Sequence, residues 1–221
     1  MLSFFLFRAH CPTPDAEPAP AEVVKKDEPV PPAPPISNFA LNDSAGHECS
    51  LADFKDKKAI AIVFIGTECP LVNLYVGRLA EMQREYGPRG LQILAVNSNG
   101  HDSVEAIAKH AASRHLPFPV LVDADQRVAD RLKAARTPEA ILLDAGWIVR
   151  YRGRIDDQYA VGADRRSPLR HDLKEAIIDV LAGKTVRVAE TKVEGCFISR
   201  AVAPAPQEPE RQVTYCRDVA P

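Results

Sequence analysis

Cys69 is the residue whose position in this chain most clearly predicts chemistry. It lies in the segment Gly66-Thr67-Glu68-Cys69-Pro70, between a buried apolar run and the pattern of a long amphipathic helix. A thiol at a helix N-terminus faces unpaired amides and the positive end of the helix dipole, and both stabilise a thiolate. Pro70 suits the first helical position, where its missing N–H would have had no partner. We therefore predict a nucleophile with a lowered pKa; the alternative is an inert buried cysteine.

A second signal is the sequence Arg136-Thr137-Pro138, directly before an apolar run at 139–143. Proline entering a central strand is unusual unless its peptide bond is cis or it is the first residue of the strand. We predict a cis Thr137–Pro138 bond beside Cys69; the alternative is an ordinary loop proline. In this interpretation Arg136 and the helix amides stabilise the charge of the thiolate, and Thr67 hydrogen-bonds its sulfur.

The other cysteines are scattered along the chain: Cys11, Cys49, Cys196 and Cys216. An odd total without a Cys-x-x-Cys or Cys-x-x-Cys-His motif is not a disulfide framework, and the spacing does not suit a structural zinc site. We predict no metal and no cofactor. Cys196 follows the last predicted helix on a glycine-containing turn and is the candidate resolving thiol; the alternative is an external thiol.

Composition restricts the class of protein. The 221 residues are 46% hydrophobic and 26% charged, with a net charge of −2, so the chain can build a core. The near-neutral balance argues against a general nucleic-acid binder. No run of about 18 apolar residues is present, so no transmembrane segment is predicted.

Both ends of the chain are rich in proline, which divides it into three predicted parts. Residues 1–35 are an apolar start and a Pro-rich linker, 36–184 the folded domain, and 185–221 an extension with a Pro-rich spacer at 203–209. An apolar start followed by a linker favours an extracytoplasmic domain, periplasmic or secreted; the alternative is a cytoplasmic protein.

Between the ends, apolar runs alternate with helical stripes. Strands are predicted at 39–41, 48–51, 59–65, 91–96, 119–122, 140–143 and 148–151. Helices are predicted at 70–86, after Asp102 or Ser103, at 126–134, and from Ser167 or Pro168. This order predicts an α/β three-layer sandwich with a mixed central sheet, helices on both faces and an N-terminal hairpin extension. The charged run at 150–157 is predicted to be a solvated hairpin with local ion pairs.

The block from about residue 36 to 183 resembles the thioredoxin-like redoxins of the alkyl hydroperoxide reductase C / thiol-specific antioxidant group. The motifs that carry the resemblance are GTECP around Cys69, RTPE around Pro138 and RYRGRIDDQY at 150–159. The resemblance implies that Cys69 is the attacking cysteine and Pro138 the cis-proline facing it. Val72 stands where thioredoxins carry a second cysteine, and the peroxiredoxin pattern Pro-x-x-x-Thr-x-x-Cys is incomplete.

These observations favour a thiol oxidoreductase that uses Cys69 on a peroxide or a protein disulfide, with an external thiol as reductant. The alternative is a non-catalytic thioredoxin-fold module that binds a partner within a larger redox protein. Residues 213–221 resemble the start of a cytochrome-like haem segment that follows such redoxins in larger proteins, which suggests a fragment. No haem is inferred for this chain, and its oligomeric state is not predicted.

Overall fold

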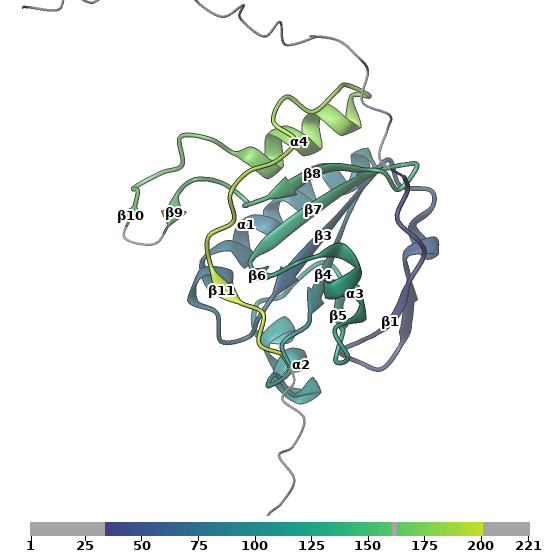
Figure 1. The fold of residues 1–221 in the computed structure, drawn as a ribbon, viewed down its shortest axis with the longest axis vertical. Helices are drawn as coiled ribbons and strands as arrows, with labels where there is room; N and C mark the ends of the chain where they lie inside the picture. The colour runs from purple at the N-terminus through teal and green to yellow at the C-terminus, as the bar shows by residue number, and fades with distance from the viewer. Residues whose placement is uncertain (1–33, 161–162, 201–221) are drawn as a thin grey trace, which may run out of the picture. The chain divides into compact units, whose positions relative to one another are not determined.

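The computed structural model describes residues 34–160 and 163–200, which form a three-layer α/β sandwich as predicted (Figure 1). Its centre is a seven-stranded mixed sheet of order β2-β1-β5-β4-β3-β7-β8. The strands are β1 Ala40–Asp43, β2 Glu48–Ser50, β3 Ala59–Ile65, β4 Leu91–Asn97, β5 Val120–Val122, β7 Glu139–Asp144 and β8 Val149–Gly153. The predicted N-terminal hairpin is β1–β2, and β1 joins the sheet by pairing with β5.

The middle strand β3 explains why the sheet is covered on both faces. All seven of its residues are buried, and it pairs with β4 in parallel and with β7 in antiparallel orientation. Because side chains alternate along a strand, Ala61 and Val63 enter one core, while Ile62 and Phe64 enter the other. An uninterrupted apolar run is the pattern that this two-sided burial requires.

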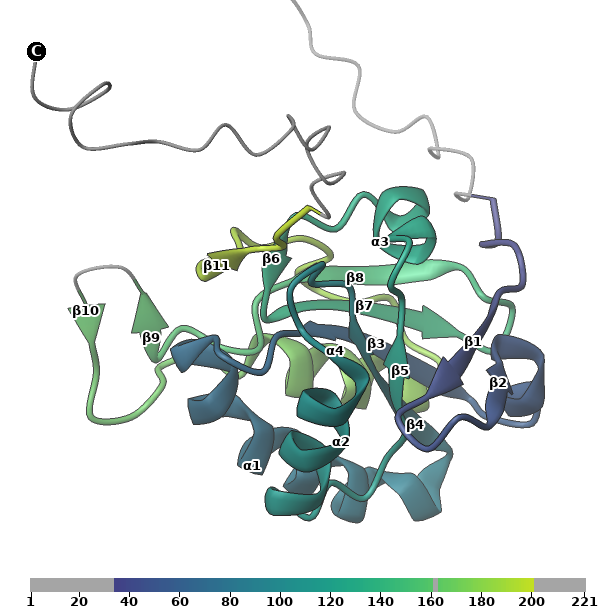
Figure 2. The same ribbon diagram turned by 90° about the horizontal axis from the view of Figure 1, so that it is seen from below.

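Four helices cover the two faces: α1 Pro70–Tyr86, α2 Val104–Ser113, α3 Arg127–Leu132 and α4 Asp172–Leu181. Helices α1, α2 and α4 contribute side chains to the core that contains Val63, and α3 contributes to the core that contains Phe64. Figure 2 shows α1 and α2 on one side of the sheet and α3 on the other. Within the described residues, no helix is both long enough and apolar enough to span a membrane.

The prediction that the last helix starts at Ser167 or Pro168 is wrong. Helix α4 begins at Asp172, because Asp157 Oδ1 accepts hydrogen bonds from the amides of Leu169 and Arg170 at 2.8 and 3.0 Å and holds that stretch as a loop. The short strands β9 Tyr159–Ala160 and β10 Ala163–Asp164 pair with each other and were not predicted.

The segment after α4 packs against the domain. We call residues 189–200 the strap. The amide of Arg152 on β8 donates to the carbonyl of Ala189 at 2.9 Å, and the amide of Thr191 donates back to the Arg152 carbonyl at 3.0 Å. Strand β11 Cys196–Phe197 of the strap then pairs with β6 Arg136–Thr137 (Figure 1). Residues 185–188, between α4 and the strap, form no strand.

Several predictions fall outside the described residues. They concern the apolar start and almost all of the linker at 1–35, the thiols Cys11 and Cys216, the spacer at 203–209 and the resemblance at 213–221.

Candidate active site

Cys69 is the last residue of the loop that connects β3 to α1. It is the N-cap residue of α1, with extended backbone angles, and Pro70 occupies the first helical position as predicted. The side chain is only 5% exposed, and its Sγ donates a hydrogen bond to the carbonyl oxygen of Thr137 at 3.2 Å. The thiol is therefore largely enclosed, and one of its polar neighbours belongs to the segment before Pro138.

The surroundings of Cys69 favour its thiolate. Burial opposes ionisation, but the hydrogen bonds that a thiolate can accept from the Cys196 thiol, the Thr137 side chain and the backbone amides of Val72 and Cys196 lower the pKa of Cys69. The amide of Val72 belongs to the first turn of α1, where amides have no helical acceptor. The direction of this pKa shift agrees with the prediction.

Thr137 contacts both cysteines. Its bond to Pro138 is cis, which confirms the prediction. Its residue partner across the β6–β11 pair is Cys196, while its carbonyl accepts the hydrogen bond from Cys69. The Thr137 hydroxyl is buried and has no hydrogen-bond partner among the described residues. That hydroxyl is therefore free to donate to the sulfur when Cys69 loses its proton.

Cys196 is the second thiol of the site and differs from Cys69 in two respects. It is exposed, whereas Cys69 is buried. Partial burial of the sulfur, the hydrogen bond to Cys69 and the negative charge of Cys69 raise the pKa of Cys196 to about 11. Of the two thiols, Cys69 is therefore the one that loses its proton first.

Glycine at position 195 allows Cys196 to approach this closely. Gly195 has φ +147°, and a Cβ atom added there would lie 2.1 Å from the carbonyl oxygen of Thr137. Only glycine adopts this backbone conformation readily and leaves room for the contact. The prediction that a glycine-containing turn presents Cys196 therefore has a concrete geometric basis.

Thr67 and Arg136 make contacts other than those predicted. The Thr67 hydroxyl donates to Asp102 Oδ1 at 2.5 Å instead of to the sulfur of Cys69. Arg136 donates to the carbonyl oxygen of Gly195 at 2.7 Å, and its guanidinium lies 3.9 Å from the ring centroid of Phe197. Arg136 therefore contacts the strap and does not hydrogen-bond the sulfur of Cys69.

Sequence reasoning missed the polar group that follows β4. The Asp102 carboxylate also accepts hydrogen bonds from the Thr67 amide at 3.0 Å and from the side chains of Asn97 and Asn99 at 2.7 and 3.2 Å. Burial opposes ionisation of Asp102, but its hydrogen bonds with Thr67, Asn97 and Asn99 lower its pKa. The sequence order could have indicated this contact. The parallel strands β3 and β4 end at the same edge of the sheet, so the residues that follow them, Thr67 and Asp102, are expected to lie close together.

A cavity of about 200 Å³ opens at this edge. Its lining comes from four separate segments: Glu68, Cys69, Asn99, His101, Thr137, Cys196 and Phe197. Within the described ranges, no group of three His, Cys, Asp or Glu side chains is arranged to hold a metal ion. The chemistry that the cavity offers is that of two thiols.

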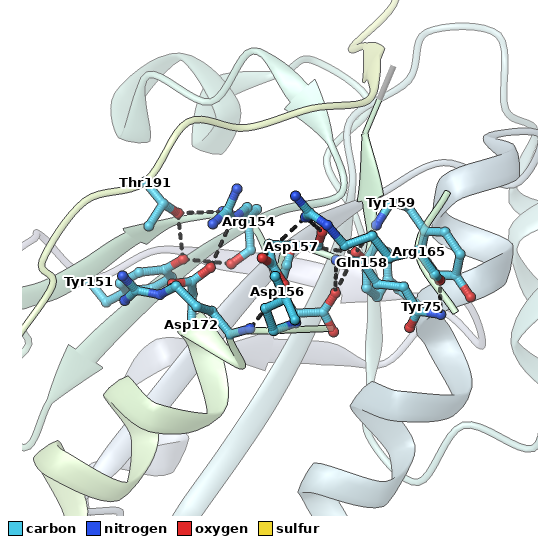
Figure 3. A network of polar contacts seen from close by, with 12 residues as sticks. Tyr75, Tyr151, Arg154, Asp156, Asp157, Gln158, Tyr159, Arg165, Asp172 and Thr191 are labelled. Carbon is cyan, nitrogen blue, oxygen red and sulfur yellow. Dashed lines mark hydrogen bonds and ion pairs between the residues drawn. The ribbon is translucent and has the colours of Figure 1, made fainter. Parts of the chain in front are cut away.

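A buried network fixes the other end of the charged run at 150–157 (Figure 3). The prediction of a solvated hairpin is wrong here, because Asp156 is only 1% exposed. Its carboxylate accepts a hydrogen bond from the hydroxyl of Tyr75 at 2.7 Å and pairs with Arg78. Arg78 also donates to Gln158 at 2.7 Å. The network thereby joins helix α1, which carries Cys69, to the loop after β8.

The same network reaches the strap. The hydroxyl of Tyr151 donates to the carbonyl of Arg154 at 2.6 Å and lies 2.7 Å from the hydroxyl of Thr191. Arg154 pairs with Asp172 at 2.7 Å at the start of α4. Figure 3 shows these residues in a row that leads from Thr191 to Tyr75. Arg170 joins the two groups, because it pairs with Asp172 at 3.0 Å and its amide donates to Asp157 at 3.0 Å. Asp157 pairs in turn with Arg165, whose carbonyl accepts a hydrogen bond from Gln158. The strap and α1 are therefore held by one continuous set of polar contacts.

A helix-capping cysteine with a cis-proline segment against it, on a mixed sheet covered on both faces, defines a thioredoxin-like redoxin. The profile of the AhpC/TSA family matches residues 32–158, and the chain belongs to this family.

Among known proteins, the chain is 29% identical over 107 residues to the thiol-disulfide oxidoreductase ResA of Geobacillus kaustophilus. That match covers 48% of this chain and 60% of the relative. A crystal structure of a hypothetical protein from Sinorhizobium meliloti superposes with a TM-score of 0.71 at 30% identity, covering 80% of this chain and 98% of that one. The peroxidoxin BcpB of Mycobacterium tuberculosis shares the fold, with a TM-score of 0.53 at 15% identity over 69% of this chain and 96% of its own.

Proposed function

We propose that this protein is a thiol oxidoreductase in which Cys69 is the nucleophile and Cys196 the resolving cysteine. The observation that carries the proposal is the pairing of β11 with β6, which sets Cys196 opposite Thr137, the residue that accepts the hydrogen bond of Cys69. A disulfide requires Cα atoms roughly 4.4–6.8 Å apart, and cross-strand contact through Thr137 supports a short path between the two thiols. Thr137, Pro138 and Arg136 position this pair, and Thr67 fixes the loop before Cys69 through Asp102.

The first step is attack by the Cys69 thiolate. On a disulfide RSSR, the sulfur of Cys69 forms a mixed disulfide and expels RS⁻. On a hydroperoxide ROOH, the O–O bond breaks, Cys69 becomes a sulfenic acid, and RO⁻ leaves and takes a proton. The thiolate is favoured by the amide of Val72 and by the Cys196 thiol, as the direction of its pKa shift indicates.

The second step is resolution by Cys196. While Cys69 is a thiolate, its charge and its hydrogen bond are two of the causes that raise the pKa of Cys196. Oxidation of Cys69 removes both causes, whereas the positive charge of Arg136, which lowers the pKa of Cys196, stays in place. Cys196 then attacks Cys69, forms the intramolecular disulfide and releases RSH from the mixed disulfide or water from the sulfenic acid. An external thiol restores the two cysteines.

The substrate class is part of the proposal. The name of the ResA relative supports disulfide exchange, while the name of the AhpC/TSA family supports peroxide reduction. A purely non-catalytic binding module gives no reason for a lowered Cys69 pKa next to a second thiol. An extracytoplasmic location and fusion to a haem segment remain predictions from the sequence.

The test is turnover by the wild-type chain and by Cys69→Ser, Cys196→Ser and Cys49→Ser. Insulin reduction and hydrogen peroxide consumption are both measured with dithiothreitol as reductant. We expect activity in at least one assay, loss of it in Cys69→Ser, a strong decrease in Cys196→Ser and no change in Cys49→Ser. After one equivalent of oxidant, the tryptic peptides 59–78 and 193–200 should be disulfide-linked. A fully active Cys69→Ser would refute the proposal.

A further inference from the structure

The two cysteines of the site differ in their exposure to solvent. Cys69 is 5% exposed and lies beneath the strap, whereas Cys196 is exposed on it. Phe197, next to Cys196, is 69% exposed and also lines the cavity. A molecule that approaches this edge of the domain therefore meets Cys196 and Phe197 before it meets Cys69.

The strap is anchored on both sides of Cys196, so this cover is not a loose tail. Before Cys196, the Gly195 carbonyl accepts the hydrogen bond from Arg136. After it, the amide of Ile198 donates to the carbonyl of Ala135 at 2.9 Å, and the Ile198 side chain is buried in the core. The carbonyl of Ser199 then accepts a hydrogen bond from the amide of Gly100 at 3.0 Å. These contacts hold the strap over Cys69, which meets solvent only through the shared cavity, and leave Cys196 the more exposed of the two cysteines.

We propose that the external thiol that reduces the Cys69–Cys196 disulfide attacks the sulfur of Cys196 and expels Cys69. The partner is thus a thiol, RS⁻, that approaches the exposed face of β11 beside Phe197. The inference rests on the proposed function, because it starts from the disulfide that the proposed function forms.

The leaving-group pKa also favours attack at Cys196 with Cys69 as the leaving group. In thiol–disulfide exchange, the sulfur with the lower thiol pKa leaves faster. Cys69 has the lowered pKa and Cys196 the raised one, so expulsion of Cys69 is the favoured direction. The step gives R–S–S–Cys196 and the Cys69 thiolate. A second RS⁻ attacks the mixed disulfide, releases RSSR and leaves Cys196 to take up a proton.

The experiment uses the full chain with Cys11, Cys49 and Cys216 replaced by serine, so that only the two site cysteines remain. The protein is oxidised with one equivalent of diamide, mixed with glutathione, quenched with acid at short times, alkylated with N-ethylmaleimide and digested with trypsin. We expect glutathione on peptide 193–200 and N-ethylmaleimide on peptide 59–78. Glutathione on peptide 59–78, with Cys196 alkylated, would overturn the inference and leave the proposed function intact.

If no mixed disulfide accumulates, a second measurement distinguishes attack at Cys196 from attack at Cys69. The rate constants for reduction of the disulfide are compared for 2-mercaptoethanol and for a thiol carried on polyethylene glycol. Attack at the exposed Cys196 predicts rates within about threefold of each other, whereas attack at buried Cys69 predicts a loss of more than about tenfold for the bulky thiol. Failure of diamide to link the two peptides would instead refute the proposed function itself.

Discussion

Replacing Gly195 with alanine should separate the two cysteines without touching either. The added Cβ would lie 2.1 Å from the carbonyl oxygen of Thr137 and 2.9 Å from its carbonyl carbon, and both are backbone atoms of the segment against Cys69. Neither can move without disturbing β6, so we expect the strap to give way. Displacement of β11 removes Cys196 from its place opposite Thr137.

The size of the effect follows from the strain that the alanine adds to the docked strap. A non-glycine residue at φ +147° costs about 1–3 kcal/mol while the strap stays docked. The hydrogen bonds of the strap, such as the one from Arg136 to the Gly195 carbonyl, are lost on undocking in the wild type as well and do not add to this difference. At its upper end of about 3 kcal/mol, the strain decreases the docked population roughly a hundredfold.

The assay is the rate of Cys69–Cys196 disulfide formation after one equivalent of oxidant, followed by quenched alkylation. Gly46→Ala is the matched control, because Gly46 also has a positive φ, +89°, but a Cβ there meets no atom within 4 Å. We expect Gly195→Ala to form the disulfide at least about tenfold more slowly than Gly46→Ala, with an increased Cys69 pKa. A rate within about twofold of wild type would show that the strap does not place Cys196.

Three further predictions concern the surroundings of the site. Thr137→Val removes a hydroxyl without a partner among the described residues, so alkylation of Cys69 at pH 7 should slow while the urea midpoint changes little; an unchanged alkylation rate would exclude the hydroxyl as a thiolate donor. Because the pKa of Asp102 is lowered in the folded state, its contribution to stability is present above its ordinary pKa of 3.8 and is lost as the pH falls through the lowered value. Asp102→Asn should flatten this acid limb of the stability profile in urea titrations; a limb of unchanged slope would assign it to other carboxylates. Arg78→Met leaves Asp156 buried without its cation and should cost about 3–5 kcal/mol in unfolding free energy, whereas Arg89→Met, on the surface of the same region, should cost less than about 1 kcal/mol.

The sequence was sufficient for the parts of the fold that repeat a local pattern. The apolar run at 59–65 and the stripe at 70–86 predicted β3 and α1, and the junction between them predicted the place of Cys69. The proline at 138 predicted its cis bond because prolines rarely enter central strands.

The parts that escaped prediction depend on distant partners. Strand β11 has two residues and pairs with β6, far away in the sequence, so it shows no periodicity of its own. Asp156 was assigned to a solvated loop because its partner Arg78 belongs to α1. The hydroxyl of Thr67 was assigned to Cys69, but Asp102, which arrives from the end of β4, is the stronger acceptor.

The order in which the polypeptide is made gives the strap one more consequence. Cys69 and the three strands around it are synthesised long before Cys196, and domains begin to fold while the chain is still growing. A nascent chain that has formed its sheet but not yet released residues 189–200 therefore has an uncovered Cys69 and lacks Cys196. Under the proposed function, the cysteine pair is thus completed last, when the final stretch of the described chain docks and covers the site.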